Sequence, residues 1–210
     1  MRRALIVVAA VALFLVGADL GLRALAQYWI AGQIQTSFEV RGRPSVSLGG
    51  FPFLPRLITG RFPEVRIQSR GTVDTGRFPL SGVDLILRQV RFPADQLLFG
   101  NKATIRAASG SGTVTLTEDD INRAFPATVP VTIHLRGEKV RIESSNGTVE
   151  TRLRVSGNRL LLVPVEGSLP VEVRVELPLI VRGITYTGVG IERSRALLRF
   201  RLTRPSILVR

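Results

Sequence analysis

Apolar and polar residues alternate one by one in several stretches of this chain, and no other feature of the sequence constrains the fold as strongly. The stretch VEVRVEL at residues 171–177 places its Val and Leu side chains on one side and its charged side chains on the other. Because successive side chains of a β-strand point to opposite faces, the pattern predicts antiparallel strands with one face in water. The same alternation occurs at residues 64–68, 131–136, 139–143, 150–155 and 198–202.

Short polar turns separate several of the alternating stretches. Gly137-Glu138, Asn146-Gly147 and Gly157-Asn158 are dipeptides typical of tight β-hairpins. A brief helix is expected in TLTEDDINRAF, where Thr117 can cap the first turn and Asp120 can complete a capping box. The sequence therefore predicts many antiparallel strands and few helices.

The N-terminus has a different pattern. Arg2 and Arg3 precede an uncharged apolar run, Ala4–Ala18, which matches the core of a signal peptide and is shorter than the roughly 20 residues of a full membrane span. Continuing through residues 19–22 would make it long enough for a tilted anchor. Small-x-small sites at residues 16–18 and 24–26 are candidate cleavage sites, and a buried core helix is a further alternative. Residues 1–26 are therefore predicted to be a signal peptide or membrane anchor, with residues 27–210 as one domain.

An amphipathic helix is expected over residues 20–38. Its apolar positions recur every three or four residues and form one stripe, which includes Trp29. Gly42 and Pro44 then end the helix, as a C-terminal Gly followed by Pro should. Two helices cannot cover the apolar face of so many strands. We therefore expect an α+β fold in which the sheet either curls around the long helix or leaves an apolar furrow.

Composition excludes several classes of function. The chain has no cysteine and one histidine, His134, so thiol nucleophiles and Cys- or His-rich metal sites are excluded or disfavoured. The motif SGSG at residues 109–112 lacks the Lys of a phosphate-binding loop, and the acids at 118–120 are typical of a first helical turn. We expect no catalytic residue, metal or cofactor. The net charge of +13 indicates an acidic partner, and for an exported protein that partner is a membrane surface rather than nucleic acid.

The stretch VSLGGFPFLPRLITGRFPEV at residues 46–65 is the strongest candidate binding site. Gly49-Gly50 allows a sharp turn, and Pro52 and Pro55 stiffen the chain that follows. Core packing is the alternative for its apolar side chains. A guanidinium beside apolar residues suits a phospholipid, since it binds phosphate through two hydrogen bonds. The predicted lipid contacts are Phe51, Phe53, Leu54, Leu57, Ile58 and Trp29, and the predicted headgroup contacts are Arg56 and Arg61.

The order of these features resembles the LmeA-type phospholipid-binding proteins of actinobacteria. The resemblance covers most of the chain after residue 18, and its most specific part is the pattern G-F-P-F-L-x-x-L-x-x-G that begins at Gly50. It implies a tubular lipid-binding (TULIP-like) fold in which a curved antiparallel sheet wraps a long helix. It also implies binding of phospholipid, phosphatidylinositol among the candidates, in support of lipomannan-type glycolipid maturation.

We therefore expect a non-enzymatic protein at the extracytoplasmic face of the plasma membrane, which binds or transfers anionic phospholipid in an apolar groove. The alternative from a different class is a membrane-anchored scaffold that assists an envelope glycosyltransferase and carries no lipid.

Overall fold

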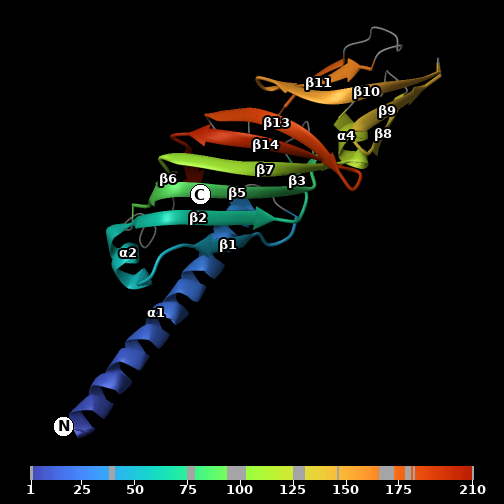
Figure 1. The fold of residues 1–210 in the computed structure, drawn as a ribbon. Coiled ribbons are helices and arrows are strands. Elements are labelled where there is room, and N and C mark those ends of the chain that lie inside the picture. The colour runs from blue at the N-terminus through green and yellow to red at the C-terminus, as the bar shows by residue number, and fades with distance from the viewer. Residues whose placement is uncertain are drawn as a thin grey trace.

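The structure is a computed structural model that describes residues 2–37, 41–74, 79–93, 103–124, 131–145, 147–165, 173–177, 181 and 183–209 (Figure 1). Most of these residues form antiparallel strands, preceded by one long helix. The helices are α1 (Arg2–Ser37), α2 (Phe53–Thr59) and α4 (Glu118–Ala124). The strands are β1 (Ser45–Leu48), β2 (Arg61–Ser69), β3 (Val73–Asp74), β4 (Pro79–Leu80), β5 (Gly82–Arg91), β6 (Ala103–Arg106), β7 (Ser109–Thr117), β8 (Val131–Arg136), β9 (Lys139–Ser144), β10 (Gly147–Ser156), β11 (Arg159–Pro164), β12 (Val173–Glu176), β13 (Ile184–Glu192), β14 (Arg195–Thr203) and β15 (Ser206–Val209).

The larger sheet has eight strands, with the order β1-β2-β5-β7-β14-β13 and with β6 and β15 attached beside β5. Its register aligns apolar side chains across neighbouring strands. Leu198 of β14 stands between Val114 of β7 and Val189 of β13, and Val114 is in turn opposite Val83 of β5. Since Val114 and Leu198 are almost fully buried, this row lies on the core face of the sheet.

The smaller sheet has five strands in the order β12-β11-β10-β9-β8. Its hairpin turns at residues 137–138 and 157–158 are those that the sequence predicts. The third predicted turn includes Asn146, which lies outside the described residues. The two sheets meet where β10 lies beside β13 (Figure 1). The antiparallel strands and the long N-terminal helix confirm the predicted α+β class.

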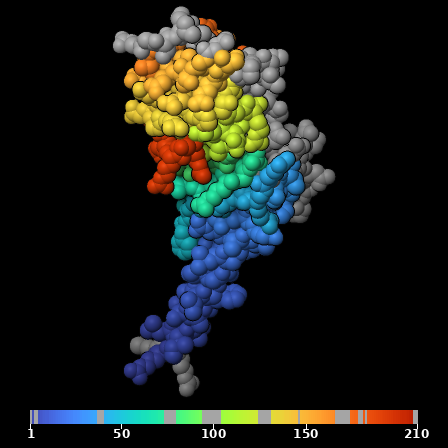
Figure 2. Space-filling model, turned by 90° about the vertical axis from the view of Figure 1, so that its right-hand side faces the viewer, coloured from blue at the N-terminus to red at the C-terminus, as the bar shows by residue number. Residues whose placement is uncertain are grey.

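Helix α1 is only partly covered by the sheets. Near its C-terminal end Ile30, Ala31 and Ile34 are buried against the core, where α1 contacts β1 and β15. The first half is exposed: Leu5 and Phe14 keep 71% and 74% of their surface in solvent. This half stands clear of the body of the molecule (Figure 2). By length and composition, residues 5–36 could cross a membrane, and this is the one helix in the described part of the chain that could.

Candidate functional site

The predicted binding stretch folds into a short helix between two turns. Gly50 has a φ of +103°, which opens the turn, and Pro52 occupies the N-cap of α2. Gly60 ends the helix in the left-handed conformation, with its N–H directed to the carbonyls of Arg56 and Leu57. The prolines of this stretch do not prevent a short helix. A helix forms because its prolines stand at the N-cap and in the first turn, where backbone N–H groups have no intrahelical acceptor.

A carboxylate from α1 satisfies the first turn of α2. Asp19 Oδ1 accepts hydrogen bonds from the backbone N–H groups of Phe53 and Leu54, at 2.8 and 2.7 Å, and Oδ2 lies 2.8 Å from the same Phe53 nitrogen. Asp19 is only 5% exposed although most of α1 around it is open. A negative charge at a helix N-terminus is favourable, and hydrogen bonds to a charged acceptor are the stronger kind. Sequence reasoning did not find Asp19, because its partners lie 34 and 35 positions away.

The six residues that were predicted to contact lipid differ in their solvent exposure. Phe53 is completely buried and packs against Phe62, with ring centroids 5.7 Å apart. Leu54 and Leu57 are half-buried. Phe51 and Ile58 are 62% and 76% exposed and form the outer surface of the α2 tip, by which we mean residues 50–60. The structure therefore fixes the α2 tip to the core through Phe53 and presents Phe51 and Ile58 outward.

Trp29 lies apart from the α2 tip. It is on α1, about 15 Å along the helix axis from Asp19, and it is 45% exposed. Its neighbour Tyr28 is 62% exposed. The Arg43 guanidinium lies 3.5 Å from the centre of the Tyr28 ring and donates a hydrogen bond to the Tyr28 carbonyl at 3.0 Å. A second aromatic and basic group, with its aromatic residues on α1 and Arg43 from the segment that follows, thus lies beyond the tip.

The two predicted headgroup arginines have different surroundings. Arg56 is half-buried and folds back over Gly50, where any side chain would collide with the guanidinium. Its buried Nε has no hydrogen-bond partner among the described residues. Arg61 is exposed at the start of β2, directly opposite the exposed Arg91 of β5. Sequence reasoning missed Arg91, since only the strand register brings it beside Arg61.

A series of half-buried apolar side chains borders the core on both sheets. Val83 and Val189 belong to the larger sheet, and Leu153, Val155 and Val175 to the smaller one. Each packs against the core while part of its surface stays open. We call these five residues the half-buried series. Apolar area of this kind can be covered by an apolar ligand.

Two hollows in the described part of the molecule have mixed linings. One of about 670 Å³ lies at the β10–β11 hairpin beside β12, and one of about 380 Å³ lies on the outer face of β5, β7, β13 and β14. Arginines and polar groups line both. The first is lined by Ser156, Gly157, Asn158, Arg159, Leu161, Arg174, Glu176 and Leu177. The second is lined by Asp84, Ile86, Ser111, Gly112, Thr113, Thr187, Arg199, Phe200 and Arg201.

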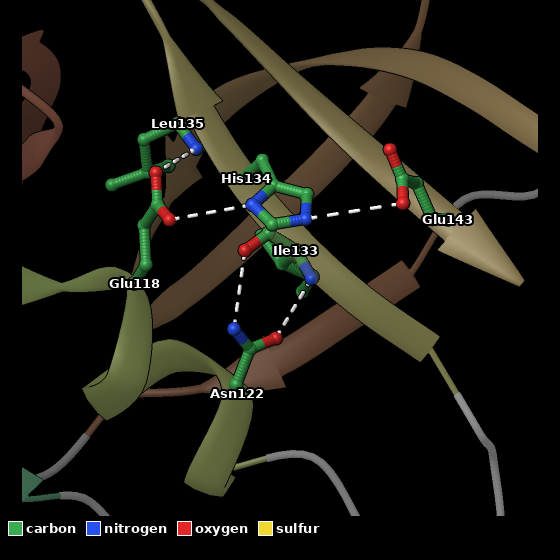
Figure 3. Close-up of polar contacts among 6 residues, drawn as sticks. All are labelled: Glu118, Asn122, Ile133, His134, Leu135 and Glu143. Carbon is green, nitrogen blue, oxygen red and sulfur yellow. Dashed lines mark hydrogen bonds and ion pairs between the residues drawn. The ribbon is translucent and has the colours of Figure 1, made fainter.

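The histidine belongs to a polar contact between α4 and β8 (Figure 3). Glu118 Oε1 accepts the Leu135 N–H at 2.7 Å, and its Oε2 lies 3.4 Å from His134 Nδ1. Asn122 pairs with both backbone groups of Ile133, at 2.8 and 3.1 Å. These bonds attach the helix to the edge of the smaller sheet. No group of His, Cys, Asp and Glu suited to a metal ion occurs among the described residues.

Two ionisable groups outside the tip have shifted pKa values. A 2.7 Å hydrogen bond from Lys139 and the attraction of its charge lower the pKa of the exposed Glu150 carboxyl. Burial raises the pKa of Tyr186, on β13 beside Phe200, to about 12. Glu150 lies in an ion-paired outer face, and Tyr186 lies in the core, so both shifts accompany structural roles.

Comparison with known proteins identifies the family. The model of the LmeA-like phospholipid-binding family matches residues 17–206, nearly the whole chain. No curated protein and no solved structure matches this chain. The match begins two residues before Asp19 and includes the α2 tip and the described strands from β1 to β14, and it ends at the first residue of β15. The chain belongs to the LmeA-like phospholipid-binding family.

Proposed function

We propose that this protein binds or transfers anionic phospholipid outside the cytoplasm and thereby supports maturation of cell-envelope lipids or lipomannan-type lipoglycans. The observation that supports the proposal most is the match to a phospholipid-binding family along nearly the whole chain. The apolar first half of α1 is compatible with a signal sequence or an anchor, either of which leads to the envelope. The role we propose is binding rather than catalysis.

The acyl chains would lie along the half-buried series. Val83 and Val189 stand at opposite ends of a row whose middle residues, Val114 and Leu198, are buried. Leu153, Val155 and Val175 extend the apolar surface onto the smaller sheet. Covering such surface with a hydrocarbon chain is favourable by about 25 cal/mol per Å². A lipid that binds here would stabilise both sheets together.

The phosphate would meet arginine near the α2 tip. Arg61 and Arg91 carry adjacent positive charges with exposed side chains. Arg56 lies at the same tip with its Nε lacking a partner in the described structure. We propose that the α2 tip contacts the membrane at the place where a lipid enters or leaves. Phosphatidylinositol is a candidate ligand, and envelope glycosyltransferases are candidate partners.

Native mass spectrometry of the full chain, gently extracted in mild detergent, tests the proposal. We expect a population carrying one phospholipid, enriched in anionic headgroups relative to the membrane extract. A matched control is the variant Leu153→Asn plus Val175→Asn, which makes the half-buried series polar and should lose the lipid. Protein that is folded but lipid-free under all conditions would overturn the proposal and favour the scaffold. A reporter fused after Arg210 that is active only in the cytoplasm would also overturn it.

A further inference from the structure

The buried Asp19 carboxylate makes part of the apolar N-terminal segment belong to the folded domain. Helix α1 runs without a break through both small-x-small sites, residues 16–18 and 24–26. Cleavage at the second site would remove Asp19 and leave the buried N–H of Phe53 without its acceptor. The first site lies in the middle of a continuous helix, and proteolysis favours exposed loops.

We propose that α1 is retained as a membrane anchor and that Asp19 holds the α2 tip permanently in the outer leaflet. This differs from a tip that meets the membrane only during lipid exchange. The inference does not depend on whether the domain carries a lipid.

The length of α1 sets the depth of Asp19. A span needs roughly 20 residues to cross about 30 Å of hydrocarbon. Counted from Ala4, such a span ends near Arg23, so Asp19 lies about 6 Å inside the hydrocarbon edge. An unpaired carboxylate there would be costly, because lipid offers no hydrogen-bond donor. The N–H groups of Phe53 and Leu54 supply the missing donors, which requires the α2 tip to enter the leaflet with Asp19.

The exposed side chains of the tip agree with this depth. Phe51 and Ile58 are large, apolar and 62% and 76% exposed, although the rest of α2 is anchored by the buried Phe53. In water their exposure is unfavourable, whereas among acyl chains it is favourable. Phe51 lies two residues before the first turn of α2, which contacts Asp19, and Ile58 lies in the next turn of the same short helix. An α2 tip that enters the leaflet with Asp19 would therefore carry both side chains into it.

The aromatic residues further along α1 would lie outside the hydrocarbon, at the depth of the lipid headgroups. Tyr28 and Trp29 lie about 8 to 9 Å beyond Arg23 along the helix axis, and both are exposed. Trp and Tyr are enriched at the headgroup layer of membranes. Arg43, stacked on Tyr28, adds a positive charge at that height. Along α1 the apolar span therefore comes first, followed by Asp19 with the α2 tip bound to it. Arg23 comes next, and the exposed aromatic residues follow at the level of the headgroups.

The absence of cysteine in the chain allows a direct measurement of depth. Single-cysteine variants Phe51→Cys and Ile58→Cys would carry a polarity-sensitive fluorophore, in full-length protein reconstituted in phosphatidylcholine–phosphatidylglycerol vesicles. The control, Thr148→Cys, lies exposed on β10 in the smaller sheet. We expect blue-shifted emission at positions 51 and 58, and quenching by acyl-chain spin labels several-fold greater than at position 148. The membrane-extracted protein should have the intact mass of 23.0 kDa.

The role of Asp19 is tested with Asp19→Leu in the Ile58→Cys background. This change keeps α1 apolar and removes the acceptor, so quenching at position 58 should fall toward that at position 148. Quenching that stays unchanged would refute the role of Asp19. A mature protein that begins after residue 18 or 26, or equal quenching at positions 51, 58 and 148, would overturn the retained anchor and the inserted tip.

Discussion

Asp19 and Phe53 are joined through a carboxylate and a backbone N–H that are both removed from water. The two oxygens of Asp19 lie 2.8 Å from the Phe53 nitrogen, and the Phe53 ring is fully buried among the core aromatics. The backbone of Phe53 is thus held by helix α1 and its ring by the core of the sheet. The pair connects the N-terminal helix mechanically to the domain.

Replacing Asp19 should destabilise the domain in detergent. Asp19→Ala leaves the buried N–H of Phe53 and the partly buried N–H of Leu54 without their acceptor, and each lost hydrogen bond to a charged group costs about 1.5 to 3 kcal/mol. Asp19→Asn keeps one acceptor oxygen and should cost less. Urea unfolding followed by circular dichroism measures the difference. Asp119→Asn, at an exposed acid on α4, is the control and should change stability by less than about 0.5 kcal/mol. Equal stability of Asp19→Ala and the unmodified protein would contradict the coupling.

The two phenylalanines of the tip should respond oppositely to truncation. Phe53→Ala removes a fully buried ring and should cost about 3 to 5 kcal/mol, a fall in Tm of about 10 °C. Phe51→Ala removes a ring that is 62% exposed and should leave Tm nearly unchanged while weakening binding to vesicles. Thermal melts and vesicle co-sedimentation on the same samples separate the two effects. If Phe51→Ala lowered Tm as much as Phe53→Ala, Phe51 would belong to the core.

The arginines in and beside the α2 tip should make vesicle binding depend on charge and salt. A basic residue near an anionic surface contributes about 1 kcal/mol, so Arg61→Gln should weaken binding to anionic vesicles about fivefold at low salt. Arg152→Gln changes an exposed arginine on β10 and is the matched control. Binding should decrease as salt screens these charges. Binding of equal strength to anionic and zwitterionic vesicles, unaffected by salt, would rule out the headgroup role of Arg61.

Alkaline pH should weaken the fold through Tyr186. Burial raises its pKa to about 12, whereas an unfolded tyrosine ionises near pH 10. Between these values the folded state retains a proton that the unfolded state has lost, so stability falls as pH rises through 10 to 12. The loss should reach up to about 2 kcal/mol. The free energy of unfolding should change less between pH 9 and pH 11.5 in the Tyr186→Phe variant than in the unmodified protein. An equal change in the two proteins would contradict the assignment of the pH dependence to Tyr186.

The strands that sequence reasoning predicted are those with charged outer faces. The alternation at residues 131–136, 139–143 and 150–155 corresponds to β8, β9 and β10, because their outer faces stay in water. Strand β7 was missed because SGSG resembles a loop. Its Gly112 is required by close packing: a side chain there would collide with the Asp84 carbonyl and the Phe200 ring. That requirement comes from strands β5 and β14, and local sequence does not reveal it.

The candidate site was predictable only where local sequence determines its structure. Local chemistry identified the α2 tip and its prolines, glycines and arginines. The burial of Phe53 and the exposure of Ile58 depend on which side of a seven-residue helix faces the sheet. The pairing of Arg61 with Arg91 depends on strand register. Both are set by contacts between distant parts of the chain, which spacing within one segment does not specify.

The exposed first half of α1 and its second half, which packs against the sheet, form one unbroken helix, and this affects how the protein would meet partners at a membrane. A domain on a flexible tether rotates freely and presents every face to its surroundings. With α1 retained in the membrane as proposed, a domain continuous with this 36-residue helix and fixed also through Asp19 would keep one orientation relative to the bilayer normal. If α1 stays in the membrane, any membrane-bound partner would approach by lateral diffusion and would always meet the same sides of the protein. The relative orientation of the two proteins would then be fixed before they meet. The partner would have to find this protein only by diffusion in the plane of the membrane.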